Sequence, residues 1–153
     1  MPGRTVRHVM AMVASAAIAA CSPEETNNLV GAASSGNLPR VKEMVGQRAN
    51  VNARAFDDGQ TALIAAARGG KQDVVEYLIA NGADVNLKDA GGTPLYWAAF
   101  EGQVSIFNYL HAHGGRLNAD ESSLAHLLRV LREKGLIDLA NVVTSFAAQE
   151  KSG

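Results

Sequence analysis

The chain has 153 residues, 47% of them hydrophobic but only 5% aromatic, which indicates one domain with a core of small aliphatic side chains. Its formal net charge is −1, and without residues 1–20 twelve basic residues face fifteen acidic ones. A mildly acidic chain without a basic stripe argues against nucleic acid as a partner. The single cysteine, Cys21, excludes an intrachain disulfide and a cysteine-based metal site.

Residues 1–20 have the layout of a secretory signal peptide. Arg4, Arg7 and His8 form a basic start without acids, and the run from Val9 to Ala20 carries no charge. As a helix this run is too short to span roughly 30 Å of hydrocarbon, and it ends in small residues. We expect residues 1–20 to be removed, which would leave no transmembrane helix in the mature protein. The alternative is an N-terminal helix docked on the domain.

The end of this segment, Ile18-Ala19-Ala20-Cys21, is similar to the bacterial lipobox, in which an aliphatic and two small residues precede the lipidated cysteine. The resemblance implies cleavage after Ala20 and lipidation of Cys21, with residues 21–25 as the lipidated cysteine and a short tether. Cleavage by an ordinary signal peptidase after Ala17-Ile18-Ala19 is the alternative.

Ser22, next to the cysteine, resembles the residue found in lipoproteins sent to the outer membrane. We therefore expect a periplasmic protein, anchored to the outer membrane, whose only membrane contact is the N-terminal lipid.

Two patterns then recur with a period near 33 residues. The first reads Arg48-Ala49-Asn50-Val51-Asn52, Gly82-Ala83-Asp84-Val85-Asn86 and Gly114-Gly115-Arg116-Leu117-Asn118, at offsets of 34 and 32. The second is an alanine pair followed by glycine, at Gly36, Gly70 and Gly102, with the same offsets. Two independent markers that move together predict stacked helical repeats.

Each unit carries two apolar stripes with helical spacing. In the clearest unit Thr61 is placed to cap the first helix, and Gly69-Gly70 ends it. After Ala119 the repeat pattern disappears, but two helical stripes remain on either side of Gly135. This last unit suits a terminal cap with a polar outer face, and we expect residues 149–153 to be a frayed tail.

At this point the sequence resembles the ankyrin repeat family. The stretch Thr93-Pro94-Leu95-Tyr96-Trp97-Ala98-Ala99-Phe100-Glu101-Gly102 and the segment from Thr61 to Asn86 match its consensus, although Ile64 and Tyr96 replace the usual histidine. The resemblance implies an all-α solenoid of about four helix pairs joined by β-hairpin-like loops. It would cover residues 26–149, with units at about 26–57, 58–90 and 91–118 and a C-terminal cap at 119–149.

The candidate chemical groups do not form an active site. His111 and His113 lie two residues apart, whereas histidines that bind zinc from one helix are usually four apart. We interpret His126 as a half-buried packing residue and Ser122-Ser123 as a helix cap. No Ser/His/Asp set or carboxylate pair offers a role for each member, so we expect no enzyme activity, no metal and no cofactor.

In the ankyrin family, the hairpin tips and the exposed ends of the inner helices line a concave binding face. The residues of this chain that match those positions are Phe56, Asp57, Asp58, Gln60, Lys88 and Asp89 on the tips and Arg68, Tyr96, Phe100 and Glu101 on the inner helices. Aromatic and arginine side chains often anchor protein interfaces. The alternative for Tyr96 and Trp97 is that they fill gaps between units.

These features predict a monomeric, non-enzymatic module, anchored in the bacterial envelope, that binds a protein partner on its concave face. Two finer roles stay open. One is an immunity protein that neutralises a secreted toxin such as a phospholipase effector, by analogy with small ankyrin-type lipoproteins. The other is an accessory lipoprotein that supports an envelope oxidative-stress enzyme.

Overall fold

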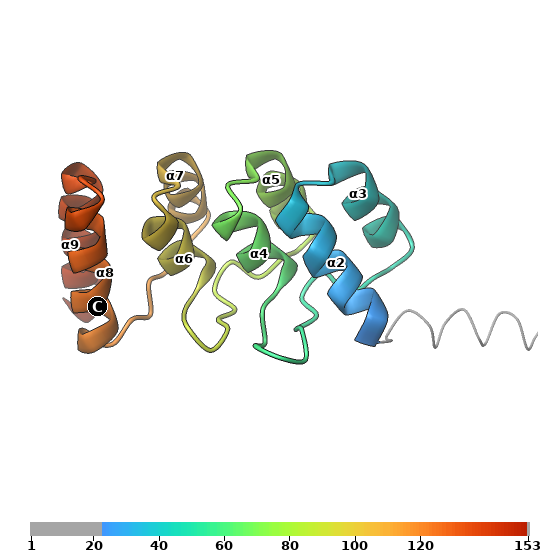
Figure 1. Ribbon diagram of the computed structural model, residues 1–153, viewed down its shortest axis with the longest axis horizontal. Coiled ribbons are helices and arrows are strands. Elements are labelled where there is room, and N and C mark those ends of the chain that lie inside the picture. Colours follow the sequence, from blue (N-terminus) through green and yellow to red (C-terminus); the bar gives the residue numbers. More distant parts are fainter. Residues whose placement is uncertain (1–22, 153) are drawn as a thin grey trace, which may run out of the picture.

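The computed structural model describes residues 23–152, which form eight helices and contain no strand (Figure 1). The proposed signal peptide and Cys21 lie outside these residues. None of the helices that are described is long and apolar enough to cross a membrane. The helices are α2 (Pro23–Ser35), α3 (Leu38–Gly46), α4 (Ala62–Arg68), α5 (Gln72–Ala80), α6 (Pro94–Glu101), α7 (Val104–Ala112), α8 (Glu121–Glu133) and α9 (Ile137–Ser152).

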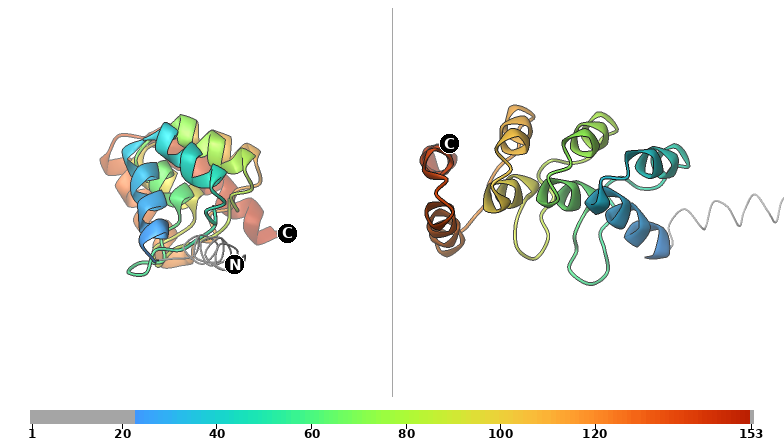
Figure 2. Two further views of the ribbon diagram at one scale, coloured as in Figure 1. Left: turned by 90° about the vertical axis from the view of Figure 1, so that its right-hand side faces the viewer. Right: turned by 45° about the horizontal axis from the view of Figure 1, so that its top comes forward.

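Consecutive helices pair, and the pairs stack in one row. The inner helices α2, α4, α6 and α8 pack on one another in that order, and α3, α5 and α7 form a parallel outer row that α9 continues (Figure 2). Two long loops, after α3 and after α5, project on the side of the inner helices. The predicted all-α stack of four helix pairs is therefore confirmed, although the loops contain no strand in the part that the structure describes.

Small side chains allow the inner helices to approach closely. Every residue of α4 from Ala62 to Ala67 is buried, and so are Ala98 and Ala99 of α6. Thr61 caps α4 as predicted, because its hydroxyl oxygen accepts a hydrogen bond of 3.3 Å from the backbone N–H of Ile64. The core is continuous from Leu29 to Val143, so the stack buries one shared interior.

The two recurring patterns have a backbone cause. Gly36, Gly70 and Gly102 follow the inner helices with φ between 69° and 81°, and Gly135 repeats this conformation after α8. The first position of the five-residue pattern is also left-handed, at Gly82, at Gly114 and, unusually, at Arg48 with φ 67°. Glycine adopts this conformation without steric cost, which explains the period in the sequence.

The last position of the pattern joins neighbouring units. The side chain of Asn52 donates to the carbonyl of Gly82 at 3.1 Å and accepts from the backbone N–H of Asp84 at 2.8 Å. Asn86 forms the same pair of bonds one unit later, with Gly114 and Arg116. Each asparagine therefore satisfies the backbone of the next unit, and we call this arrangement the asparagine ladder.

The ladder ends differently at the C-terminus. The backbone N–H groups of Leu117 and Asn118 donate to the carboxylate of Glu150, at 2.8 and 3.3 Å. Glu150 belongs to α9, which continues to Ser152, so residues 149–152 are helical and the prediction of a frayed tail there was wrong. The structure places the start of α2 at Pro23, a residue that suits a first helical turn.

The cap also begins differently from the expectation. Asp120, rather than Ser122-Ser123, caps α8, because its carboxylate accepts a 2.7 Å hydrogen bond from the backbone N–H of Ser123 and another from the Ser122 hydroxyl. These hydrogen bonds lower the pKa of Asp120 below its ordinary value of 3.8. The negative charge of Asp120 also complements the helix dipole at this end of α8.

Candidate partner-binding face

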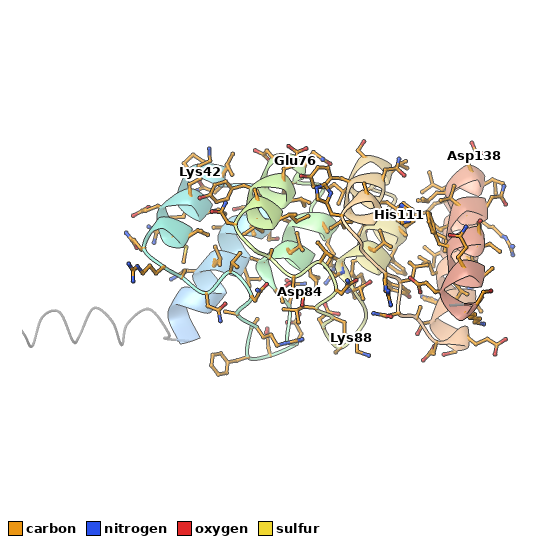
Figure 3. All side chains as sticks on the ribbon, turned by 180° about the vertical axis from the view of Figure 1, so that it is seen from behind. Lys42, Glu76, Asp84, Lys88, His111 and Asp138 are labelled. Carbon is orange, nitrogen blue, oxygen red and sulfur yellow. The ribbon has the colours of Figure 1, made fainter. Side chains whose placement is uncertain are left out.

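The candidate residues of the loops lie on two tips. Phe56, on the first tip, leaves 73% of its surface exposed, and Asp57 beside it is also exposed. Asp58 shapes this tip, because its carboxylate accepts a 2.9 Å hydrogen bond from the backbone N–H of Gln60. Lys88 is exposed on the second tip, at the edge of the molecule opposite Lys42 and Glu76 of the outer helices (Figure 3).

Asp89 has an internal role in the second tip. One of its carboxylate oxygens accepts hydrogen bonds from the backbone N–H groups of Gly91 and Gly92, both at 2.8 Å, and from the Trp97 indole at 2.9 Å. The Trp97 ring also lies so close to Gly91 that a Cβ there would not fit. Asp89 therefore holds its own loop and fixes the orientation of Trp97 through this one oxygen.

The side chain of Arg68, at the end of α4, packs against residues of the neighbouring unit. Its guanidinium is 4.2 Å from the centre of the Trp97 ring, a cation–π contact, and its Nε is 3.9 Å from a Glu101 carboxylate oxygen. Both side chains remain about one third exposed, at 39% and 31%. The sequence-predicted residues Arg68 and Glu101 are therefore brought together across α4 and α6.

Phe100 connects this group to the cap. Its ring lies 5.6 Å from the Trp97 ring, edge to face, and 5.9 Å from the His126 ring, roughly stacked. Lys134, just after α8, donates a 2.6 Å hydrogen bond to the Phe100 carbonyl and places its ammonium 5.4 Å from the ring centre. The same ammonium is 4.0 Å from the other Glu101 oxygen. Phe100 is therefore half-buried rather than fully exposed.

Tyr96 lies beneath this surface. Only 6% of its area is exposed, and its hydroxyl donates a long hydrogen bond of 3.5 Å to the Ser123 carbonyl of α8. Burial, and secondarily the charge of Asp120, raises the pKa of its phenol above the ordinary 10.0. Tyr96 therefore packs between units, as the alternative interpretation held, and is too buried for a partner to contact.

Apart from Tyr96 and Asp89, the predicted residues fall into two groups. Arg68, Phe100 and Glu101 form one continuous surface together with Trp97, Lys134 and His126, and we call these six residues the concave cluster. Phe56, Asp57, Asp58, Gln60 and Lys88 form a separate group on the tips. His126, which we interpreted as half-buried, is exposed at the rim of the concave cluster.

Lys134 was not among the predicted residues, although the sequence contains a clue to it. Gly135 lies 33 residues after Gly102, so it continues the series of glycines that follow the inner helices. Lys134 then occupies the position that Glu101 has one unit earlier, and opposite charges at equivalent positions of stacked units can meet. The loss of the other motif residues in the last unit concealed this register.

The concave cluster offers an apolar platform with charged groups beside it. Within residues 23–152 no three histidine, cysteine or acidic side chains gather as a metal site would require. The cluster contains aromatic rings and a guanidinium, which are groups that often anchor protein interfaces.

Comparison with known proteins agrees with this architecture. Residues 29–121, more than half of the chain, match the family profile described as ankyrin repeats in three copies. Sixty residues are 43% identical to the human Arf-GAP with coiled-coil, ANK repeat and PH domain-containing protein 3, over 39% of this chain. Sixty-four residues are 39% identical to the rat ankyrin repeat and SAM domain-containing protein 6, over 42% of this chain.

This chain covers only 7% of the length of each of these relatives, so the likeness concerns the repeats alone. The match ends at residue 121, where α8 begins, which agrees with the loss of the motif in the cap. Ankyrin repeats generally bind protein partners and are generally not enzymes. On the repeat pattern, the helix stack and this match, the chain belongs to the ankyrin repeat family.

Proposed function

We propose that the chain is a binding module that holds a protein partner on the concave cluster and on the first loop tip. The observation that carries this proposal is the exposure of aromatic and charged groups there. Phe56 is largely exposed, and Arg68 lies over Trp97 beside Phe100, on the surface of the inner helices. Aromatic and arginine side chains of this kind supply much of the binding energy at protein interfaces.

Site-specific photocrosslinking tests this proposal. A benzophenone amino acid placed at position 56 or 68 should capture the same protein from cells that contain the partner. The matched controls are positions 42 and 76, which lie on the outer helices α3 and α5 at the edge opposite Lys88 (Figure 3). Capture from positions 42 and 76 but not from 56 or 68 would contradict the proposal.

The identity of the captured protein would also distinguish the finer roles. A secreted toxin would support the immunity role, and an envelope oxidative-stress enzyme would support the accessory role. A second measurement follows the affinity of the purified partner for Phe56→Ala and Arg68→Ala. Each substitution should weaken binding by about 1 kcal/mol or more, roughly fivefold, while Lys42→Ala and Glu76→Ala leave it unchanged.

We further propose that Cys21 carries a lipid that anchors the domain to the outer membrane, facing the periplasm. Cys21 lies outside the described residues, so this proposal rests on the basic start, the short apolar run and the Ile-Ala-Ala-Cys ending of residues 1–21. Detergent phase partition tests it. The wild type should enter the detergent phase and Cys21→Ser should not, whereas a wild type that stays in the aqueous phase with its N-terminus at Ala20 would contradict lipidation.

A further inference from the structure

The concave cluster contains two cations but only one carboxylate. Glu101 lies between two cations, with one carboxylate oxygen 3.9 Å from Arg68 Nε and the other 4.0 Å from Lys134 Nζ. Both distances are longer than the N···O distance of a strong charge-assisted hydrogen bond, which is about 2.7–2.9 Å. One carboxylate therefore serves two cations and holds neither closely, so Arg68, Lys134 and Glu101 together carry a net charge of +1.

The Arg68 guanidinium is held in an orientation that can bind a second anion. Its guanidinium is held at 4.2 Å over the Trp97 ring, and the Trp97 indole is fixed in turn by Asp89. A guanidinium that stacks on a ring lies parallel to it, so its N–H groups point outward in the guanidinium plane. A carboxylate can accept hydrogen bonds from two of them. Among the described residues Arg68 donates no hydrogen bond, and its side chain is 39% exposed.

Lys134 offers a second donor on the far side of Glu101. Its ammonium uses one N–H for the Phe100 carbonyl, at 2.6 Å, and remains 39% exposed. The rings of Trp97 and Phe100 lie between the two cations, and the centres of these rings are 5.6 Å apart. The cluster therefore combines two incompletely paired cations with an apolar floor.

We propose that the concave cluster recognises an acidic side chain of the protein partner that lies next to an apolar one. The partner's carboxylate takes the place of Glu101 between Arg68 and Lys134, and the neighbouring apolar side chain covers Trp97 and Phe100. This inference rests on the proposed function and names the chemistry of its partner. Because Lys134 belongs to the cap, the cap supplies part of the recognition and does more than cover the last repeat.

The probe for the test is a library of random twelve-residue peptides displayed on phage and selected on the full chain. Recovered peptides should carry Asp or Glu beside an apolar residue. A synthetic copy of the commonest peptide should bind Arg68→Gln and Lys134→Gln about tenfold more weakly, since each loses a charge-assisted contact. Arg68→Lys should also weaken binding, because an ammonium lacks the two-pronged geometry.

Glu101→Gln gives the sharpest result. It removes the internal competitor without changing the shape of the side chain, so the acidic peptide should bind it about three- to tenfold more tightly. Lys42→Gln is the matched control and should leave affinity unchanged. Melting temperatures of all variants show whether a lost affinity reflects a lost fold, and Arg68→Lys keeps the test valid if Lys134→Gln unfolds.

The outcomes separate this inference from the proposed function. Weaker binding to Glu101→Gln, or recovered peptides without an acid, would overturn the acidic partner; if those peptides still lose affinity on Phe56→Ala or Phe100→Ala, the concave face remains the binding surface. Peptides that bind every one of these variants as they bind the wild type would overturn both proposals.

Discussion

The repeat pairs and the C-terminal pair cover the same kind of apolar surface with different residues. Between repeats, Asn52 and Asn86 satisfy the backbone of the next unit, and threonine caps begin α4 and α6. At the cap, Glu150, Lys134 and Asp120 take over these tasks. A repeat must present the same contacts on both sides, whereas a cap needs them on one side only, so its residues are free to differ from the motif.

This difference has a consequence for function. The repeats alone would present Arg68, Trp97, Phe100 and Glu101, but the second cation and the stacked His126 come from α8 and its end. The candidate binding surface is therefore built across the boundary between the two regions. Substitutions that separate the cap from the repeats should disturb both stability and binding.

The largest expected effect comes from removing residues 122–153. The truncation deletes the buried Leu127, Leu131, Leu139 and Val143 and uncovers the third repeat. Each residue of this size contributes roughly 1.5–3 kcal/mol, so the loss is comparable with the total stability of about 5–15 kcal/mol of a typical domain. Circular dichroism should show an unfolded or aggregated chain. A monomeric truncation with the wild-type melting temperature would contradict this prediction.

The asparagine ladder gives the next largest effect. Asn86→Ala removes two hydrogen bonds between the second and third repeats and should lower the free energy of unfolding by about 1–3 kcal/mol. Glu150→Ala should cost a similar amount at the cap, because it also leaves two backbone N–H groups unpaired. Urea titrations measure both, with the exposed Asn108→Ala as a control within about 0.5 kcal/mol of wild type. Equal values for Asn86→Ala and Asn108→Ala would show that the ladder does not stabilise the stack.

A pH titration tests the junction between α6 and α8. Because burial raises the pKa of Tyr96, the folded state favours its neutral phenol. Its contribution to stability is fully present below the unfolded pKa of about 10 and is lost as pH rises through the higher folded pKa. Melting curves between about pH 8 and 11 should therefore fall more steeply for wild type than for Tyr96→Phe. Parallel pH profiles of the two proteins would place the loss of stability elsewhere.

The smallest expected effect is a gain in the free energy of unfolding. Arg48 holds φ 67° where the later units have glycine, a conformation that costs an ordinary residue about 1–2 kcal/mol. Arg48→Gly removes this cost but adds backbone entropy to the unfolded chain, of about 0.5–1 kcal/mol. The net stabilisation in a urea titration should be about 0.5–1 kcal/mol. The neighbouring Gln47→Gly, at φ −81°, should instead destabilise, and a loss in both would contradict the explanation of the glycine period.

The sequence predicted the helix pairs because their causes are local. The small-residue helices, the Thr61 cap and the glycines after each inner helix can all be recognised within one unit. Residues that act across units were harder to recognise. Glu150 appeared to belong to a frayed tail, and Lys134 was not recognised, because nothing near them in the sequence indicates the backbone carbonyl or N–H group that each one contacts.

The candidate site shows the same limit. Arg68, Phe100 and Glu101 were predicted from repeat positions, and the structure brings them together. Tyr96 shares such a position, yet its ring lies in the gap before α8, and Asp89 is used by its own loop. A repeat motif specifies the backbone position that carries a side chain, but the neighbouring unit determines whether that side chain stays exposed.

The central claim is that the cap and the repeats fold as one unit that carries the concave cluster across their boundary. Trp97 is the only tryptophan of the chain, and it lies within that cluster. Urea unfolding followed by Trp97 fluorescence and by helix circular dichroism tests the claim most directly. One transition with the same midpoint for both probes is the predicted result. A fluorescence change that precedes the loss of helix, with two separate midpoints, would show that the cap detaches on its own and would contradict the account.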